Sequence, residues 1–454
     1  MSMLDRRIAP INPEPIHVAF PHTVEHTLSN GLKVMLYEQH DVPVVNVRLY
    51  IRAGSVLDGK ALKASSFVFA LLQQGTHKRT ANEIADEIEF LGAELTASSS
   101  IDFGSVSLTV MRKHLEKGLE ILSDVVLNPA FMESEIEFVR QQSLSRLQFS
   151  KADATRLSSE AFNRLIYAPH PYGNPSLGTI ESLKALTREQ LLEFYRKYFL
   201  ANRAFITVAG DIEADTMIAL LETYFGAWAS HEVEELLYEL PQKRTQSEVR
   251  LVKKDGAVQS VLNIGHLSIA RNDEAFIPLY VGNMILGGYF GSRLNMNLRE
   301  KQGFTYGIRS GFDALRLAGD FNISTQVRNE VTGETIEQIL FEVNRLLQEG
   351  ISEKELTAAK RYIMGNFVIQ NEVPTSIAVR LANVELYGLP KSYYNTYLDA
   401  INALERQQIL DALTKHLHTE SFVFVIAGDP SQVSRQVERF GALSVEDADG
   451  NLIT

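Results

Sequence analysis

The feature that most constrains this chain is an internal repeat with a period of about 220 residues. An apolar segment at 204–211 ends in Ala-Gly-Asp, and a similar segment at 422–429 ends in the same three residues. Their glycines, Gly210 and Gly428, are 428 − 210 = 218 residues apart. Each segment is typical of a buried strand that stops at a glycine turn. Because self-similarity at a fixed period indicates repeated units, the chain is predicted to fold as two homologous halves.

A pair of predicted helices precedes each of these strands and supports the repeat. The first pair is expected at 115–127 and 134–149, and the second at 334–347 and 352–370. The second helix of each pair is predicted to open at a serine followed by acidic residues, as capping of a helix N-terminus favours. These serines, Ser134 and Ser352, show the same offset as the two glycines.

The repeat gives a division into domains and a fold class. We expect an N-terminal repeat domain at 1–230, a linker at 231–247 and a C-terminal repeat domain at 248–454. The linker has an acidic run followed by Pro241-Gln-Lys-Arg-Thr, a composition typical of a solvated connector. An Asn30-Gly31 pair between alternating apolar residues predicts an opening β-hairpin at 25–37. The predicted class is α+β, with two α/β-sandwich halves, each a mostly antiparallel sheet covered by helices, in one bilobed chain.

Composition excludes several classes of function. The chain has 56 Asp+Glu and 44 Lys+Arg, a formal net charge of −12, which argues against a nucleic-acid partner. It has no cysteine, so any metal would need histidine or carboxylate ligands. No stretch of about 18 apolar residues predicts a membrane span, and 1–21 lacks the apolar core of a signal peptide. We expect a cytoplasmic protein, or a periplasmic one if a signal peptide has been removed.

Two histidine pairs could suggest a metal site. His22-Thr-Val-Glu-His26 matches the H-x-x-E-H pattern of inverted zinc peptidases. That pattern binds zinc on a helix, where residues four apart lie about 6 Å apart along the axis. Pro21 and the Asn30-Gly31 turn indicate a strand instead, where the separation is about 13 Å, so we expect two surface histidines. His416 and His418 are interpreted as the positively polarised C-terminal end of a helix.

Several segments together resemble the pitrilysin and mitochondrial-processing-peptidase family of zinc peptidases. They are the segments 45–55, 74–80, 83–93 and 170–173, together with the two Ala-Gly-Asp turns. The resemblance covers both halves, from about residue 24 to residue 441. It implies a bilobed fold, zinc-dependent peptide hydrolysis in catalytic members, and pairing of two such chains around a closed chamber.

The resemblance also shows what this chain lacks. Catalytic members carry H-x-x-E-H on the helix before the Gly75-Thr76 pair, and here Ser66 and Ala70 stand at the ligand positions, with Phe69 at the general-base position. The third ligand, a glutamate in a later helix, falls on Arg146, in a window at 141–147 that holds no carboxylate. Since a catalytic zinc needs at least three protein ligands, we expect no metal and no catalytic residue in this site.

A further departure lies on a sheet edge. Family members place an Asn-Ala pair on the edge that receives the substrate as an added strand, and here Thr96 replaces the Asn. The backbone of this edge could still pair with an extended peptide. The alternative is an edge strand with no ligand.

The second half keeps one functional feature of the family. Arg299 and Tyr306 match an Arg and a Tyr seven residues apart that reach across the chamber to the substrate. A guanidinium can hold a carbonyl or carboxylate, and a phenol can donate to the oxyanion formed on the attacked carbonyl. The alternative is structural: Arg299 pairing an acidic residue on a helix surface, and Tyr306 half-buried in a strand. The glycines in the preceding segment 287–294 are expected to allow close packing, since no phosphate-binding Gly-Lys-Ser/Thr follows.

The resemblance therefore implies a zinc-free, non-catalytic subunit of a heterodimeric metallopeptidase. Its partner would be a paralogous subunit that carries zinc and hydrolyses unstructured peptides, while this chain supplies Arg299 and Tyr306 in trans. Alone, this chain could form a homodimer. The alternative is a structural or peptide-binding protein of the same fold with no role in proteolysis. A peptidase that uses the His22 motif is excluded by its strand context.

Overall fold

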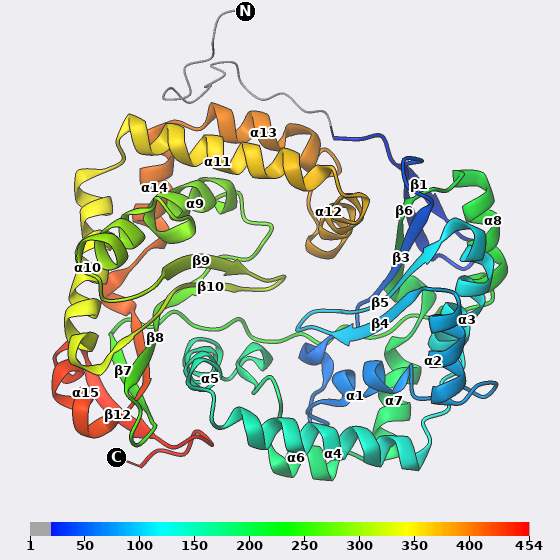
Figure 1. Cartoon of the computed structure of the whole chain (residues 1–454), viewed down its shortest axis with the longest axis horizontal. Helices are drawn as coiled ribbons and strands as arrows, with labels where there is room; N and C mark the ends of the chain where they lie inside the picture. The colour runs from blue at the N-terminus through cyan, green and yellow to red at the C-terminus, as the bar shows by residue number, and fades with distance from the viewer. Residues whose placement is uncertain (1–19, 454) are drawn as a thin grey trace, which may run out of the picture.

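The computed structural model describes residues 20–453, which form two α+β halves, each built around one six-stranded sheet (Figure 1). Most of the segment considered as a signal peptide, 1–19, lies outside the described residues, as does residue 454. Figure 1 shows the first sheet on the right and the second on the left. Seven of the ten strand pairings are antiparallel. The predicted fold class is therefore confirmed.

The first half contains β1 to β6 and α1 to α8. Its sheet has the order β1-β2-β6-β3-β5-β4. The strands are β1 (Val24–Thr27), β2 (Lys33–Glu38), β3 (Val44–Ile51), β4 (Glu94–Ser99), β5 (Gly104–Met111) and β6 (Ala204–Gly210). The helices are α1 (Ala64–Leu71), α2 (Ala81–Phe90), α3 (Leu115–Leu127), α4 (Glu133–Ser150), α5 (Ala154–Tyr167), α6 (Ile180–Ala185), α7 (Arg188–Tyr198) and α8 (Ala214–Phe225).

The second half repeats this plan with sheet order β12-β7-β11-β8-β10-β9. The strands are β7 (Glu248–Lys253), β8 (Gln259–Ser268), β9 (Ile308–Ala314), β10 (Gly319–Arg328), β11 (Val423–Gly428) and β12 (Ala442–Glu446). The helices are α9 (Phe276–Asn283), α10 (Thr332–Glu349), α11 (Glu353–Asn371), α12 (Pro374–Tyr387), α13 (Tyr393–Ala403), α14 (Arg406–His416) and α15 (Pro430–Val437). Two π-helical segments, Met284–Gly288 and Asn295–Lys301, follow α9.

The two predicted repeat strands occupy equivalent central positions. β6 and β11 are buried along their whole length, as expected for strands covered on both faces. Each runs parallel to the first long strand of its half and antiparallel to the second. The opening hairpin is not repeated, however. β1 pairs antiparallel to β2, whereas the corresponding edge of the second sheet is filled by β12, which arrives from the C-terminal end and runs parallel to β7.

The predicted helix pairs are present, with one error at a boundary. Ser352 caps α11 through a capping box with Glu355, as its sequence suggests. In the first half, Ser134 lies inside the first turn of α4. The N-cap residue is Met132, which makes no side-chain capping bond. The correct serine signal was thus present in only one of the two repeats.

The two halves exchange one helix each. Side chains of α5, among them Phe162 and Ile166, pack with Val423 and Val425 of β11 in the other half. In return, α12 packs Ile377 and other apolar residues on β6 and β2 of the first sheet. Figure 1 shows both helices between the two sheets. Because each buried aliphatic or aromatic side chain contributes about 1.5–3 kcal/mol, these helices hold the two halves together.

The two halves also meet at the tips of corresponding hairpins. Asp102, in the β4–β5 turn, accepts hydrogen bonds from the Tyr172 hydroxyl (2.5 Å) and from the backbone N–H of Arg316 (3.1 Å), in the β9–β10 turn. The Tyr172 hydroxyl accepts in turn from the N–H of Leu317 (3.2 Å). The relative position of the two sheets is therefore fixed by polar as well as apolar contacts.

The chain between α8 and β7 contains no helix or strand, but it is anchored along its length. The Tyr238 hydroxyl donates to the carbonyl of Val56 (2.7 Å), and Glu235 pairs with Arg203 (3.0 Å). This connecting segment is therefore held against the surface of the two halves. Over residues 20–453, the structure has no helix that is both long and apolar enough to cross a membrane.

Candidate functional site

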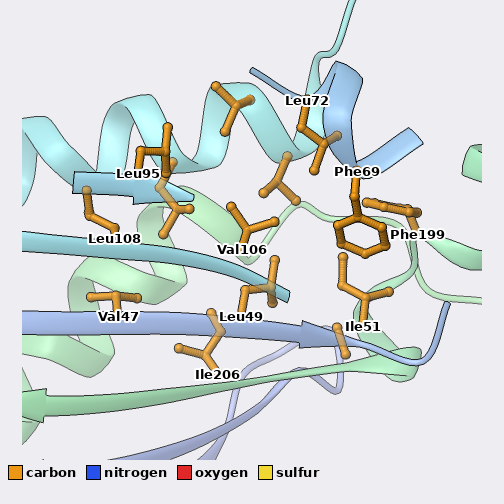
Figure 2. Close-up of a cluster of buried hydrophobic side chains, with 14 of the residues drawn as sticks. Val47, Leu49, Ile51, Phe69, Leu72, Leu95, Val106, Leu108, Phe199 and Ile206 are labelled. Carbon is orange, nitrogen blue, oxygen red and sulfur yellow. The ribbon is translucent and has the colours of Figure 1, made fainter. Parts of the chain in front are cut away.

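Helix α1 carries the positions at which a zinc helix would hold its ligands and base. Ser66 and Ala70 lie on its half-buried side, whereas Phe69 is fully buried. Figure 2 shows the Phe69 ring among apolar side chains, close to Phe199, and the two ring centroids are 5.0 Å apart. The position of the general base is therefore part of the hydrophobic core of the first half.

A lysine ammonium lies next to the first ligand position. Nζ of Lys63 donates hydrogen bonds to Oγ of Ser66 (2.7 Å) and to the carbonyl of Ser176 (2.6 Å). Burial lowers the pKa of Lys63, Asp58 opposes this shift, and the charge of Arg146 adds to it. Arg146 is exposed on α4, and α4 packs against α1.

The backbone holds Lys63 in this position. Lys63 precedes α1 with a φ of 81°, a left-handed conformation that is uncommon for a residue with a side chain. The buried carboxylate of Asp58 accepts from the N–H of Lys63 and from the N–H of Ser65, both at 2.8 Å, and so caps the helix. A non-glycine residue held in this region indicates that the surrounding contacts determine its conformation.

These residues do not suit a zinc ion. Zinc prefers histidine or carboxylate ligands in a chain without cysteine, and this site offers a hydroxyl, a methyl, a phenyl ring and two cations. In the described part of the chain, no group of three or more metal-ligating side chains could hold a metal ion. No chemical step in this chain is therefore assigned to a metal.

A side chain from the loop that follows α1 covers the free edge of strand β4. With its amide group oriented to satisfy both neighbours, Gln73 donates to the carbonyl of Leu95 (3.2 Å) and accepts from the N–H of Ala97 (2.9 Å). Thr96, between them, is exposed and pairs across the sheet with Ser107. Gln73 thus makes the two backbone hydrogen bonds that an added peptide strand would make here.

The two histidine pairs have local structures that do not suit metal ligands, but the charge of His416 differs from the one expected. His26 lies on β1, and His22 lies two residues before this strand in a segment without regular structure; both are exposed, as predicted for surface histidines. α14 ends at His416, but burial lowers the pKa of this imidazole, so the neutral form is favoured. His416 does lie with Lys415 in the basic last turn of α14, as the interpretation expects, but its lowered pKa reduces the positive charge that it adds there.

Arg299 and Tyr306 line the same cavity in the second half. The cavity has a volume of about 960 Å³ and lies between the polar face of β9 and β10, the glycine segment after α9, and α5 of the other half. Arg299 stands on the second π-helical segment, and Tyr306 lies two residues before β9. The structure thus brings this predicted pair together and separates it from the degenerate site on α1, which lines no part of this cavity.

Both side chains are available to a ligand. The guanidinium of Arg299 lies over the ring of Phe290, 4.3 Å from its centroid, and Nε is 3.5 Å from the carboxylate of the adjacent Glu300. Tyr306 is 97% exposed, so it is not the half-buried strand residue of the structural alternative. Arg299 thus pairs weakly with an acidic residue on its own helical segment, as the structural alternative expects, while stacking on Phe290 orients the plane of the guanidinium.

The glycines before Arg299 serve packing, as predicted. A Cβ on Gly287 would lie 2.3 Å from Oγ of Ser310, and a Cβ on Gly288 would lie 2.5 Å from the sulfur of Met284. The missing side chain at Gly287 lets the first π-helical segment approach β9, and the one at Gly288 makes room for the side chain of Met284. Asn295 completes this contact by donating to the carbonyl of Ile308 (2.8 Å).

A second set of polar residues in the cavity was not found from the sequence. Asp320 on β10 accepts from the hydroxyl of Tyr167 on α5 (2.6 Å) and from the amide of Asn322 (2.9 Å). Burial raises the pKa of Asp320 to about 6. Like Lys63 and Gln73, these residues match no sequence motif. Their contacts become visible only when the fold brings distant segments together.

The fold and the altered helix together define the class: a two-lobed α+β chain in which other residues stand at the positions that the resemblance assigns to the zinc ligands and the general base. Residues 33–180 match the family described as insulinase (peptidase family M16), and residues 185–363 match the peptidase M16 inactive domain. The chain belongs to the peptidase M16 family. This agrees, at the level of the family, with the resemblance seen in the sequence.

Individual relatives cover nearly the whole chain. An uncharacterized zinc protease of Mycobacterium leprae is 28% identical over 409 residues, which span 88% of this chain and 91% of that protein. A non-peptidase homolog of Helicobacter pylori is 24% identical over 410 residues, 89% of this chain and 94% of that protein. The crystal structure of a peptidase M16 inactive domain from Pseudomonas fluorescens superposes with a TM-score of 0.85 at 28% identity, covering 90% of this chain and 98% of that one.

Proposed function

We propose that this chain is the zinc-free, non-catalytic subunit of a heterodimeric metallopeptidase of the M16 family. A paralogous partner carries the zinc and the general base, and the two chains enclose an unstructured peptide. This chain contributes Arg299 and Tyr306 to the bound substrate. The position of Lys63 beside Ser66 and the buried ring of Phe69 support the absence of a second metal site here.

One observation carries the proposal: Arg299 and Tyr306 line a single cavity, where Tyr306 is almost fully exposed and Arg299 makes a cation–π contact with Phe290 and a long ion pair with Glu300. A structural arginine would be expected to make a close bidentate pair with a carboxylate. A structural tyrosine would bury most of its ring. Both residues instead line the cavity in which a ligand would lie.

Their chemistry suits peptide hydrolysis in a partner's site. The oriented guanidinium can hold a substrate carbonyl or carboxylate through two parallel hydrogen bonds. The Tyr306 hydroxyl can donate to the oxygen that becomes negative when the carbonyl is attacked. A donor of this kind acts mainly in the transition state and so raises kcat rather than affinity.

The size of the cavity supports unstructured peptides as substrates. A volume of about 960 Å³ accommodates a peptide segment or a small ligand. A folded protein would have to unfold locally to enter it. The reconstituted pair is therefore expected to degrade short peptides and to leave a stable folded protein intact.

The test is reconstitution with a paralogue that has an intact H-x-x-E-H helix. Tyr306→Phe should lower kcat of the pair by about 10- to 10³-fold with assembly and zinc content unchanged, because it removes one transition-state donor. Arg299→Ala should mainly raise KM. Tyr224→Phe on α8 and Arg328→Ala at the end of β10, both outside the cavity, serve as matched controls. If neither cavity variant changes the kinetics, the proposal is wrong.

A second candidate is a peptide-binding protein with no role in proteolysis. It is favoured by the name of the Helicobacter pylori relative, a non-peptidase homolog. In that case the chain binds peptides in the same cavity, but no paralogue gains activity on mixing. Reconstitution therefore separates the two functions.

A further inference from the structure

The cavity that holds Arg299 and Tyr306 has a charged floor, which is set by the pairing of β9 with β10. Directly paired residues point to the same face of a sheet. The pairs on the cavity face are Arg309 with Ser324, Gly311 with Asn322, and Asp313 with Asp320. Every one of these residues except Gly311 lines the cavity. The floor is therefore a polar strip across two strands.

The charges on this strip are separated by sign. Arg309 is exposed at one end of the strip, and Arg299 lines the same cavity. Asp313 and Asp320 form a negative end. Arg309 and Asp313 are four residues apart on one strand, so their Cα atoms are about 13 Å apart. An arrangement of this kind is complementary to a ligand with opposite charges at its two ends.

Hydrogen bonds fix the carboxylates at the negative end. The amide of Asn322 donates to Oδ2 of Asp313 (3.0 Å) and to Oδ1 of Asp320 (2.9 Å), and the Tyr167 hydroxyl donates to the other oxygen of Asp320. Both oxygens of the buried Asp320 are thus used. Asp313 is exposed and keeps one carboxylate oxygen for a ligand. It is the group that a cation in the cavity would meet.

On β9, between Arg309 and Asp313, the cavity face carries no side chain, because the residue there is Gly311. A Cβ on Gly311 would meet no atom within 4 Å, so the space above this residue is open. Glycine in the interior of a strand weakens the strand and often marks a place where another backbone approaches closely. Here the approach would be made by a chain that lies along β9, between Arg309 and Asp313.

We propose that this cavity binds short peptides by both free ends, with the terminal carboxylate on Arg299 and Arg309 and the terminal ammonium on Asp313. The proposal deepens the proposed function, on which it rests for the identity of the ligand as a peptide. An extended peptide of about four residues spans about 13 Å, which matches the separation of the two ends. A dicarboxylate or a diamine would meet a charge of its own sign at one end.

The experiment uses the full chain alone, without a zinc-bearing partner. Binding of one tetrapeptide is measured by isothermal titration calorimetry in four forms: with both ends free, N-acetylated, C-amidated, and blocked at both ends. Each block should weaken binding by about 10-fold, since it removes a charge-assisted contact. A ten-residue peptide should show little effect of blocking, because its two ends cannot both reach the charged ends of the floor.

Variants assign each end of the ligand. Asp313→Asn should remove the penalty of N-acetylation and keep that of amidation, and Arg309→Gln should do the reverse. Gly311→Val should weaken all forms, although a valine there meets no protein atom and suits a strand. Asp255→Asn and Arg328→Gln, outside the cavity, are the matched controls. Thermal unfolding of each variant confirms that the fold is retained.

The proposal is overturned if the four forms of the tetrapeptide bind equally, if none binds at millimolar concentration, or if folded Gly311→Val binds like the parent chain. Its failure is distinguishable from failure of the proposed function. Equal binding of all four forms, together with a lowered kcat for Tyr306→Phe in the reconstituted pair, would reject this mode of recognition and leave the proposed function standing.

Discussion

Phe69 and Gly104 share one space in the core of the first half: a Cβ on Gly104 would lie 2.0 Å from Cζ of the Phe69 ring. Gly104 begins β5, and its partner across the sheet is Ile51 on β3. The residue at the general-base position is thus accommodated by a glycine on a neighbouring strand. The residue that replaces the general base on α1 therefore packs directly on the sheet beneath this helix.

This relationship predicts a strong coupling between the two positions. Phe69→Ala should lower the free energy of unfolding by about 3–5 kcal/mol, as for other buried phenylalanines. Gly104→Ala should be destabilising in the parent chain, because its methyl group meets the ring, but nearly neutral in the Phe69→Ala background. Urea denaturation measures all four proteins, with Phe149→Ala, 81% exposed on α4, as the control. Additive effects would contradict the shared-space interpretation.

A second prediction concerns reconstruction of the zinc site. Ser66→His, Ala70→His and Arg146→Glu together restore three ligands, but Nζ of Lys63 still lies within 2.7 Å of the first position. Adding Lys63→Met should tighten zinc binding by at least about 10-fold, because it removes a positive charge from the site. Competition with a fluorescent chelator measures the affinity. Lys60→Met, an exposed neighbour, is the control and should change nothing.

Adding a general base to the same variant, through Phe69→Glu, should destabilise the protein. Phe69→Glu places a carboxyl group at a fully buried apolar position, which costs several kcal/mol unless the group is paired or neutral. The fourfold variant that includes it should therefore be less stable than the threefold variant and bind zinc no better. Zinc content by elemental analysis after dialysis, with thermal unfolding in parallel, checks this. A stable fourfold variant with tighter zinc binding would show that α1 can rotate.

A third prediction concerns the edge of β4. Gln73→Ala removes the acceptor for the N–H of Ala97, so this amide should exchange with solvent about 5- to 10-fold faster. Hydrogen exchange followed by NMR measures the single amide. Gln74→Ala, the half-buried neighbour, should leave it unchanged. Unaltered protection of Ala97 in Gln73→Ala would show that this edge is closed by something other than Gln73.

Much of the fold could be predicted because its signals are local. In the Ala-Gly-Asp turns and the Asn30-Gly31 hairpin, the residues of the turn themselves determine the local backbone conformation. The structure has these turns where expected. The exchange of α5 and α12 could not be predicted, because an amphipathic helix does not encode which of two similar sheets it covers. β12 was missed for a related reason: a short edge strand takes its partner from the tertiary fold.

The candidate site divides in the same way. Ser66, Phe69, Ala70, Arg299 and Tyr306 were named because a motif fixes their spacing. Lys63, Gln73, Arg309 and Asp320 act across distances that only the folded chain makes short. Lys63 reaches Ser176, 113 residues away, and Tyr167 reaches Asp320 from the other half of the chain. Spacing along the sequence carries no signal for such contacts.

The last prediction concerns the pH dependence of stability at Asp320. Burial raises the pKa of this carboxyl group to about 6 in the folded chain, against about 3.9 for an aspartate in an unfolded chain. Between pH 4 and 6 the folded state therefore holds a proton that the unfolded state has released. The contribution of this group to stability then falls as the pH rises through that window, by about 2–3 kcal/mol in all, and is constant above it.

Asp320→Asn cannot ionise, yet it can still accept the hydrogen bond from Tyr167. Relative to the parent chain, the variant should therefore gain about 2–3 kcal/mol of stability between pH 4 and pH 7.5, whatever its absolute stability at either pH. Urea denaturation at four pH values measures the difference. Asp313→Asn is the matched control: it removes the nearby charge that raises the pKa of Asp320 and should give only a small change of the same sign. A constant difference between Asp320→Asn and the parent chain would mean that Asp320 ionises as readily in the folded protein as in water, and that the cavity end formed with Tyr167 and Asn322 is open to solvent.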